Sequence, residues 1–171
     1  MVGYFIFYLD KIMSKKTNTI LIFILFGLSV SLISAYIIEY ALGHEPCRLC
    51  VYQRFPYIVS ILLVLSILLI KKNVKIHLLL LSLISLLGAV LAFYHFGIEQ
   101  GFFSESIVCE SQNLKEGLTK QDILKQLKQN TISCKDVNFT LFGLSLASIN
   151  IIVSFILFMI FITLYRNYEI N

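Results

Sequence analysis

The sequence predicts an all-α membrane protein: a four-helix transmembrane bundle with two cysteine-bearing loops on its outer side and a short amphipathic helix at the surface. Composition and hydropathy patterning support this. Of the 171 residues, 58% are hydrophobic and only 14% are charged, and the mean hydropathy is +0.84. A soluble domain of this length could not bury so much apolar surface. Four long apolar segments also divide the chain.

Each apolar segment can cross a bilayer, which takes about 20 residues of α-helix. The second segment is the least regular, because Arg54 and Pro56 interrupt it near its start. Four spans remain the better count than three, since an even number puts both cysteine-bearing loops on one side. We predict one transmembrane domain over residues 20–165, with its spans at residues 20–42, 51–70, 76–96 and 141–165.

The first apolar segment is predicted to be retained as a helix. Lys15 and Lys16 precede it, as basic residues precede the core of a signal peptide. Its apolar run nevertheless continues well past the 7–15 residues of such a core. Met13, which is followed by Ser-Lys-Lys, is our candidate for the true start of the chain.

The distribution of basic residues predicts the orientation. The short connection after the second span contains Lys71, Lys72 and Lys75. Short basic segments next to spans stay on the cytoplasmic side. We therefore expect residues 1–19 and 166–171 in the cytoplasm. The loops 43–50 and 97–140 then face an oxidising compartment, where disulfides persist.

All four cysteines lie in these two outer loops: Cys47, Cys50, Cys109 and Cys134. Of the three possible pairings, the natural one joins the cysteines within each loop. A closed CXXC loop constrains few residues, and its spacing is typical of reversible thiol–disulfide exchange. Spacing alone is equally compatible with a redox-active and a purely structural Cys109–Cys134 disulfide. We predict no metal site, because zinc ligands usually come as two close pairs and only one is present.

Arg54 follows the CXXC pair at helical spacing. If a helix begins near Cys50, then Cys47, Cys50 and Arg54 share one face. A cation one turn from Cys50 would lower the pKa of its thiol and favour the reactive thiolate. The alternative is that Arg54 extends its charge to the outer headgroups. An arginine at membrane depth is costly without a partner, which favours a functional role.

The second outer loop contains a pattern typical of a short helix, and the span before this loop carries a histidine near its outer end. Thr119 and Asp122 form a capping box before "ILKQLKQ", where Ile123 and Leu127 share an apolar face. A helix lying on the membrane surface fits this pattern, and a loop helix resting on the bundle fits it equally. His95, at the outer end of the third span, is either a hydrogen-bonded anchor or a contact for a polar head group.

Several stretches in order resemble the DsbB family of bacterial inner-membrane thiol oxidases, which re-oxidise the disulfide donor DsbA. They are "PCRLCVYQR", "YHFGIEQGFF" leading to Cys109, Cys134 followed by Lys-Asp, and "LFGLSLASIN". The resemblance covers about residues 17–166. It implies that Cys109 is attacked by a reduced DsbA-like partner, and that Cys134 then attacks Cys47.

The resemblance further implies that Cys50 meets a bound quinone, ubiquinone or menaquinone, with Arg54 stabilising the thiolate and the quinone oxygen. His95 matches a family histidine near the quinone pocket. The chain departs from the family in the loop after Cys109, "ESQNLKEG", which has no aromatic residue or proline. It also lacks the Trp often found after Cys134, so the partner-binding surface differs.

The predicted protein is thus a monomer in the inner membrane that contacts lipid, quinone and a DsbA-like partner, and no nucleic acid. Two alternatives remain open at this level. One is a quinone-linked thiol oxidoreductase of the vitamin K epoxide reductase type, although in those proteins the CXXC has a different place relative to the helices. The other is a non-enzymatic scaffold whose disulfides brace the outer loops.

Overall fold

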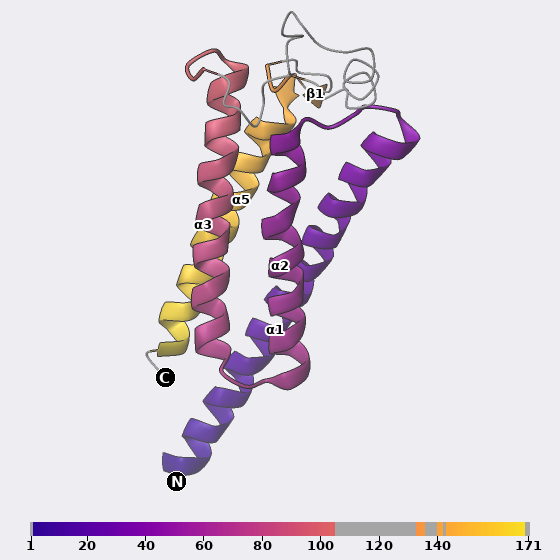
Figure 1. Cartoon of the computed structure of the whole chain (residues 1–171). Helices are drawn as coiled ribbons and strands as arrows, with labels where there is room; N and C mark the ends of the chain where they lie inside the picture. Colours follow the sequence, from indigo (N-terminus) through magenta and orange to yellow (C-terminus); the bar gives the residue numbers. More distant parts are fainter. Residues whose placement is uncertain (1, 105–132, 136–139, 142, 170–171) are drawn as a thin grey trace, which may run out of the picture.

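Four long helices dominate the computed structural model (Figure 1), which describes residues 2–104, 133–135, 140–141 and 143–169. They are α1 (Val2–Tyr36), α2 (Arg48–Ile70), α3 (Val74–Glu99) and α5 (Leu146–Glu169). Four helical stretches are long and apolar enough to cross a membrane: Lys15–Ala41, which continues from α1 into the π-helical turn after it, Arg48–Ile70, Val74–Glu99 and Leu146–Tyr168. The predicted all-α membrane bundle is confirmed. The predicted surface helix after Thr119 lies outside the described residues.

Helices α2 and α3 extend beyond the predicted spans at the end that carries the cysteines. Helix α2 begins at Arg48 rather than near residue 51, so Cys50 lies in its first turn. Helix α3 continues to Glu99, three residues beyond the predicted limit. His95 therefore lies inside a helix, with Glu99 one turn after it on the same face.

Helix α5 begins five residues later than the predicted fourth span. The strands β1 (Thr140–Leu141) and β2 (Leu144–Ser145) pair antiparallel before it. Gly143 between them has φ +80°, a conformation that glycine adopts without steric cost. The Ser145 hydroxyl then accepts a hydrogen bond from the Ser148 N–H at 3.2 Å, which caps the start of α5. A hydrophobic run alone did not reveal this turn.

Small side chains line the buried face of α3 and allow close packing. This face carries Ser82, Ser85, Gly88, Ala89 and Ala92. A Cβ at Gly88 would lie 3.5 Å from both the Pro56 Cβ of α2 and the Ser154 Oγ of α5, so three helices approach one another here. Small residues serve this purpose between membrane helices, because lipid tails offer no hydrophobic drive for helix association.

The two ends of the bundle differ in what they carry (Figure 1). Both termini and the α2–α3 connection lie at one end, and the α1–α2 connection lies with the hairpin at the other. Towards that second end α1 leans away from α3 and α5 and finishes in a π-helical turn, η1 (Ile37–Ala41). We call this second end the cysteine end, because Cys47 and Cys50 lie there.

Candidate functional site

Cys47 caps helix α2 with its sulfur. The residue is extended, with φ −66° and ψ 163°, and its Sγ accepts a hydrogen bond from the Cys50 N–H at 3.4 Å. Cys47 therefore occupies the place that Ser or Asp often takes at a helix start. The unpaired N–H groups of a helix N-terminus carry partial positive charge and stabilise an anion there. The local fold thus favours a thiolate at Cys47.

The two CXXC sulfurs are adjacent but not bonded. Cys47 and Cys50 are free thiols whose Sγ atoms lie 3.2 Å apart, whereas a disulfide bond is about 2.05 Å long. The predicted Cys47–Cys50 disulfide is therefore not formed in this structure, which holds the pair in its reduced form. Adjacent thiols are the arrangement that reversible exchange requires.

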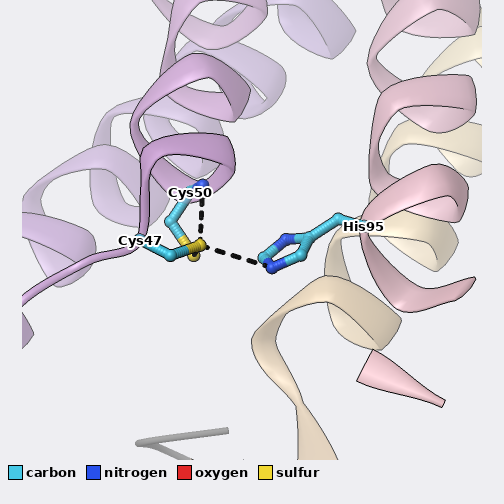
Figure 2. Close-up of side chains that lie close together, drawn as sticks. All are labelled: Cys47, Cys50 and His95. Carbon is cyan, nitrogen blue, oxygen red and sulfur yellow. Dashed lines mark hydrogen bonds between the residues drawn. The ribbon is translucent and has the colours of Figure 1, made fainter. Parts of the chain in front are cut away.

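His95 brings α3 to the cysteine pair (Figure 2). Its Nε2 lies 3.4 Å from the Cys47 Sγ, and its Nδ1 lies 2.9 Å from the Gln53 Nε2. The residue is buried, with 2% of its surface exposed. Both ring nitrogens thus contact groups of the protein, and the thiol is one of them.

These contacts change the acidity of Cys47. The hydrogen bond with Cys50 lowers the pKa of the Cys47 thiol most, and burial opposes it. A hydrogen bond and a charge interaction with His95 lower this pKa further, as does the hydrogen bond from the Cys50 N–H. The net pKa of Cys47 falls well below the ordinary value of 9.0. Because the thiolate is the nucleophile in thiol exchange, Cys47 is the reactive member of the pair in its reduced form.

Arg54 contacts the end of α1 and the η1 turn instead of the cysteines. Its Nη1 forms an ion pair with the Glu39 Oε2, and its guanidinium lies 4.8 Å from the centre of the Tyr36 ring. We expected this cation to lower the pKa of Cys50. The contacts that favour a thiolate converge instead on Cys47, while Arg54 pairs with Glu39. The sequence held a signal for this pair, since each residue is the lone charge in the interior of its apolar segment.

Four further polar residues near the site were missed at the sequence level. Gln53 and Tyr57 of α2 and Asn150 of α5 are joined by hydrogen bonds that reach His95. Glu99 Oε1 lies 3.7 Å from the His95 Nε2, and Glu99 Oε2 is buried with no hydrogen-bond partner among the described residues. Polar side chains inside otherwise apolar spans were the available signal.

Cys134 packs beside the cysteine pair. It is 2% exposed and belongs to a buried cluster with Cys47, Leu49 and Ile98. Cys134 is disulfide-bonded, whereas Cys109 lies outside the described residues. The fold therefore brings a cysteine of the second loop to the CXXC pair of the first.

The same cluster contains three potential metal ligands. The donor atoms of Cys47, Cys50 and His95 all lie within 4.8 Å of one another. Two thiolates bound to tetrahedral zinc at 2.3 Å would be about 3.8 Å apart, and the sulfurs here are separated by 3.2 Å. This spacing suits a hydrogen-bonded exchange pair better than a tetrahedral metal site.

Comparison with known proteins agrees with this geometry. The family model described as disulfide bond formation protein DsbB matches residues 17–164. The chain belongs to the DsbB family. Its relatives include the uncharacterized protein RP370 of Rickettsia prowazekii (strain Madrid E), 33% identical over 149 residues that cover 86% of this chain and 85% of that protein. As a DsbB family member with four candidate spans, the protein is a multi-pass membrane thiol oxidoreductase of disulfide bond formation.

Proposed function

We propose that this protein re-oxidises a DsbA-like thiol oxidase on the outer side of the bacterial inner membrane and passes the electrons to a membrane quinone. The observation that carries the proposal is Cys47. Its sulfur receives hydrogen bonds at a helix N-terminus and packs in one buried cluster with Cys134. A stabilised thiolate next to a second-loop cysteine is what transfer between two disulfides requires.

The proposed relay has two exchange steps. The reduced partner attacks Cys109, breaks the Cys109–Cys134 disulfide and leaves as an oxidised protein. The Cys134 thiolate then attacks Cys47, which breaks the Cys47–Cys50 bond and leaves Cys50 as a thiolate. The Cys109 thiolate resolves the Cys47–Cys134 bond by attacking Cys134, which re-forms the Cys109–Cys134 disulfide and releases Cys47 as a thiolate beside Cys50. The packing of Cys134 against Cys47 supports the second step. Each exchange moves two electrons and creates one disulfide for each that it breaks.

The thiolate site also fits the energetic demand of such a partner. DsbA has a reduction potential near −120 mV, so only another strongly oxidising disulfide accepts its electrons. A disulfide becomes more oxidising when its reduced form is stabilised. The hydrogen bonds to the Cys47 sulfur stabilise the reduced form. They therefore raise the reduction potential of the Cys47–Cys50 pair.

Arg54 and its surroundings fit a quinone. A bound quinone would take up the two electrons and two protons that Cys47 and Cys50 release when they form a disulfide. Arg54 lies one turn after Cys50 and has five N–H donors, and the Glu39 contact occupies only one of its nitrogens. The neighbouring side chains of Val51, Tyr52 and Phe55 are exposed on the surface of the bundle. A quinone could approach Arg54 from this exposed surface, and Arg54 would donate a hydrogen bond to one of its carbonyl oxygens.

His95 has a different place in this proposal from the one its family position implies. Its two ring nitrogens contact Cys47 and Gln53, which supports a role in controlling the thiol rather than in holding quinone. The basic residues Lys71 and Lys72 follow α2 at the end of the bundle away from the cysteines (Figure 1). This supports a cytoplasmic position for that end and an outer position for the cysteine pair.

The test is electron transfer by the purified full-length protein in detergent, with a reduced DsbA-like protein and a soluble quinone. Loss of quinone absorbance and oxidation of the partner should proceed together and should stop with Cys50→Ser. If the wild-type protein transfers no electrons, or if Cys50→Ser transfers them as fast, the cysteines only brace the loops and the proposal is wrong.

The two halves of the relay can be separated with Cys109→Ala. This variant should no longer oxidise the DsbA-like protein. It should still pass electrons from a small dithiol to quinone, because Cys47 and Cys50 are unchanged. Partner oxidation at the wild-type rate by Cys109→Ala would contradict the proposed order of exchange.

A further inference from the structure

A continuous chain of side-chain hydrogen bonds connects three helices to the Cys47 sulfur. It starts at Tyr57, whose hydroxyl donates to the Asn150 Oδ1 at 2.6 Å. The Asn150 Nδ2 donates to the Gln53 Oε1 at 2.7 Å, and the Gln53 Nε2 lies 2.9 Å from the His95 Nδ1. The His95 Nε2 then lies 3.4 Å from the Cys47 Sγ.

The donor direction of this chain follows from its first contact. The hydroxyls of Tyr57 and Ser154 both donate to the same Asn150 atom, and an amide atom that takes two hydroxyl donors is an acceptor. The Asn150 atom that faces Tyr57 is therefore its oxygen. The Ser154 Oγ donates to the same oxygen at 3.2 Å. The amide nitrogen of Asn150 must then face Gln53, and only the Gln53 oxygen accepts from it.

This direction fixes the tautomer of His95. With its oxygen turned to Asn150, Gln53 presents its NH₂ group to the His95 Nδ1. That nitrogen must accept, so it carries no proton, and the proton of a neutral imidazole is on Nε2. The Nε2–H then points at the Cys47 Sγ. A proton on Nδ1 would instead set two N–H donors against each other.

We propose that Gln53 and Asn150 are positioning residues that hold His95 in the Nε2–H tautomer, so that His95 donates a hydrogen bond to the Cys47 sulfur. This deepens the proposed function, because it identifies the residues that keep the exchange thiol reactive. The family match identifies the chain as a DsbB protein, but it does not assign this network.

Burial of the network favours a single tautomer of His95. Gln53 is 8% exposed and His95 is 2% exposed, so water does not compete for their hydrogen bonds. Among the described residues, the titratable groups that face His95 and Cys47 are Cys50 from α2 and Glu99 from α3. Helix α5 contributes the neutral Asn150, which contacts Gln53. Reversing the His95 tautomer would require both amides to turn over together.

The decisive measurement is the ¹⁵N NMR spectrum of the reduced full-length protein in detergent, labelled at histidine and assigned by comparison with His95→Leu. The wild type should show His95 with a protonated Nε2 and an unprotonated Nδ1. Gln53→Glu keeps the length of the side chain and still accepts from Asn150, but its carboxylate accepts from Nδ1. It should therefore move the proton to Nδ1. A wild-type Nδ1–H, or an unchanged spectrum in Gln53→Glu, would overturn the proposal.

Reactivity gives an independent readout that needs neither partner nor quinone. Iodoacetamide labelling of Cys47 at pH 4, localised by fragmentation mass spectrometry, should slow about tenfold in Gln53→Met, which removes the amide at similar volume. Ser85→Ala is the matched control, because this buried α3 hydroxyl bonds only the Leu81 carbonyl in the described structure. Equal rates in Gln53→Met and the wild type, or equal slowing in Ser85→Ala, would contradict the positioning role. Failure of electron transfer to quinone would leave both readouts intact and would count against the proposed function alone.

Discussion

Two polar clusters occupy the cysteine end of the bundle, and they handle charge in different ways. The first is the ion-pair cluster of Arg54, Glu39 and Tyr36, at the contact of α1 with α2. The second is the thiol cluster of Cys47 and His95, at the contact of α2 with α3. The side chains of Arg54 and Glu39 are 14% and 20% exposed, whereas the side chain of His95 is 3% exposed.

The difference teaches how a membrane protein separates a fixed charge from a reactive one. In the ion-pair cluster a permanent cation is neutralised by a carboxylate and covered by an aromatic ring. In the thiol cluster the anion forms only when Cys47 loses its proton, and it is stabilised by contacts with Cys50 and His95 and by a helix N-terminus. The reactive sulfur therefore does not depend on the nearest cation in the sequence.

Loss of the Cys47 thiol should have the largest effect on electron transfer among these variants. Cys47→Ser removes the sulfur on which the donors converge, so transfer between partner and quinone should fall to background. The folded bundle should persist, because α2 still has a hydroxyl at its N-cap. Partner oxidation coupled to quinone reduction measures the loss, and circular dichroism checks the helices. Residual transfer above that of Cys50→Ser would show that Cys47 is dispensable.

Arg54→Met should separate the two clusters. The variant retains the side-chain stem but removes the donors proposed for quinone, so KM for quinone should rise roughly tenfold to a hundredfold, the equivalent of about 1.5–3 kcal/mol for a hydrogen bond to a charged group. Labelling of Cys47 should remain within twofold of the wild-type rate. A large change in Cys47 reactivity would show that Arg54 controls the thiolate after all.

His95→Leu should change the Cys47 thiol and leave the ion-pair cluster intact, which is the opposite of Arg54→Met. Without the imidazole donor, the thiolate loses one of its hydrogen bonds, and the reduction potential of the Cys47–Cys50 pair should fall by roughly 30–60 mV. Equilibration with a glutathione buffer, followed by thiol counting, measures this shift. An unchanged potential would mean that the helix N-terminus and Cys50 alone stabilise the reduced form.

The pH dependence of Cys47 tests the thiol cluster without a substitution at its neighbours. The pKa of this thiol falls from 9.0 to about 4 in the reduced fold, so labelling should stay fast down to about pH 5 and slow below that. Because the folded pKa is the lower one, the associated stability is fully present above pH 9 and is lost as the pH falls towards 4. Cys47→Ala should lack this part of the pH-dependent stability. Labelling that falls steeply between pH 9 and pH 7 would contradict the lowered pKa.

Glu39→Gln should give the smallest effect. It leaves Arg54 without its ionised partner and should lower the free energy of unfolding by about 1–3 kcal/mol, as judged by denaturation in mixed micelles. Cys47 labelling should not change. The double variant with His95→Leu should show additive losses, because the clusters share no contact in the described structure. A coupling above about 0.5 kcal/mol would show that they act as one site.

The sequence alone was sufficient for the architecture and for the cysteine-bearing motifs. Apolar runs in a bilayer must form helices, because only helices satisfy their own backbone hydrogen bonds there. The four spans and the family resemblance followed from that pattern, and both are confirmed. Local spacing also placed Cys50 and Arg54 one turn apart on α2. The limit of the fourth helix was missed, because Leu141 and Leu144 are as apolar in a hairpin as in a helix.

Only the tertiary structure decided which residues meet. The 3.6-residue period of α2 predicts that Arg54 is near Cys50, but it does not predict that Arg54 turns to Glu39 while Cys47 turns to His95. Those choices depend on how α1 and α3 pack against α2, and packing is set by contacts far apart in the chain. Asn150 lies 97 residues from Gln53 and still fixes its orientation. The sequence determined the helices and the sulfur chemistry, and the packing of α1, α3 and α5 around α2 determined which side chains control it.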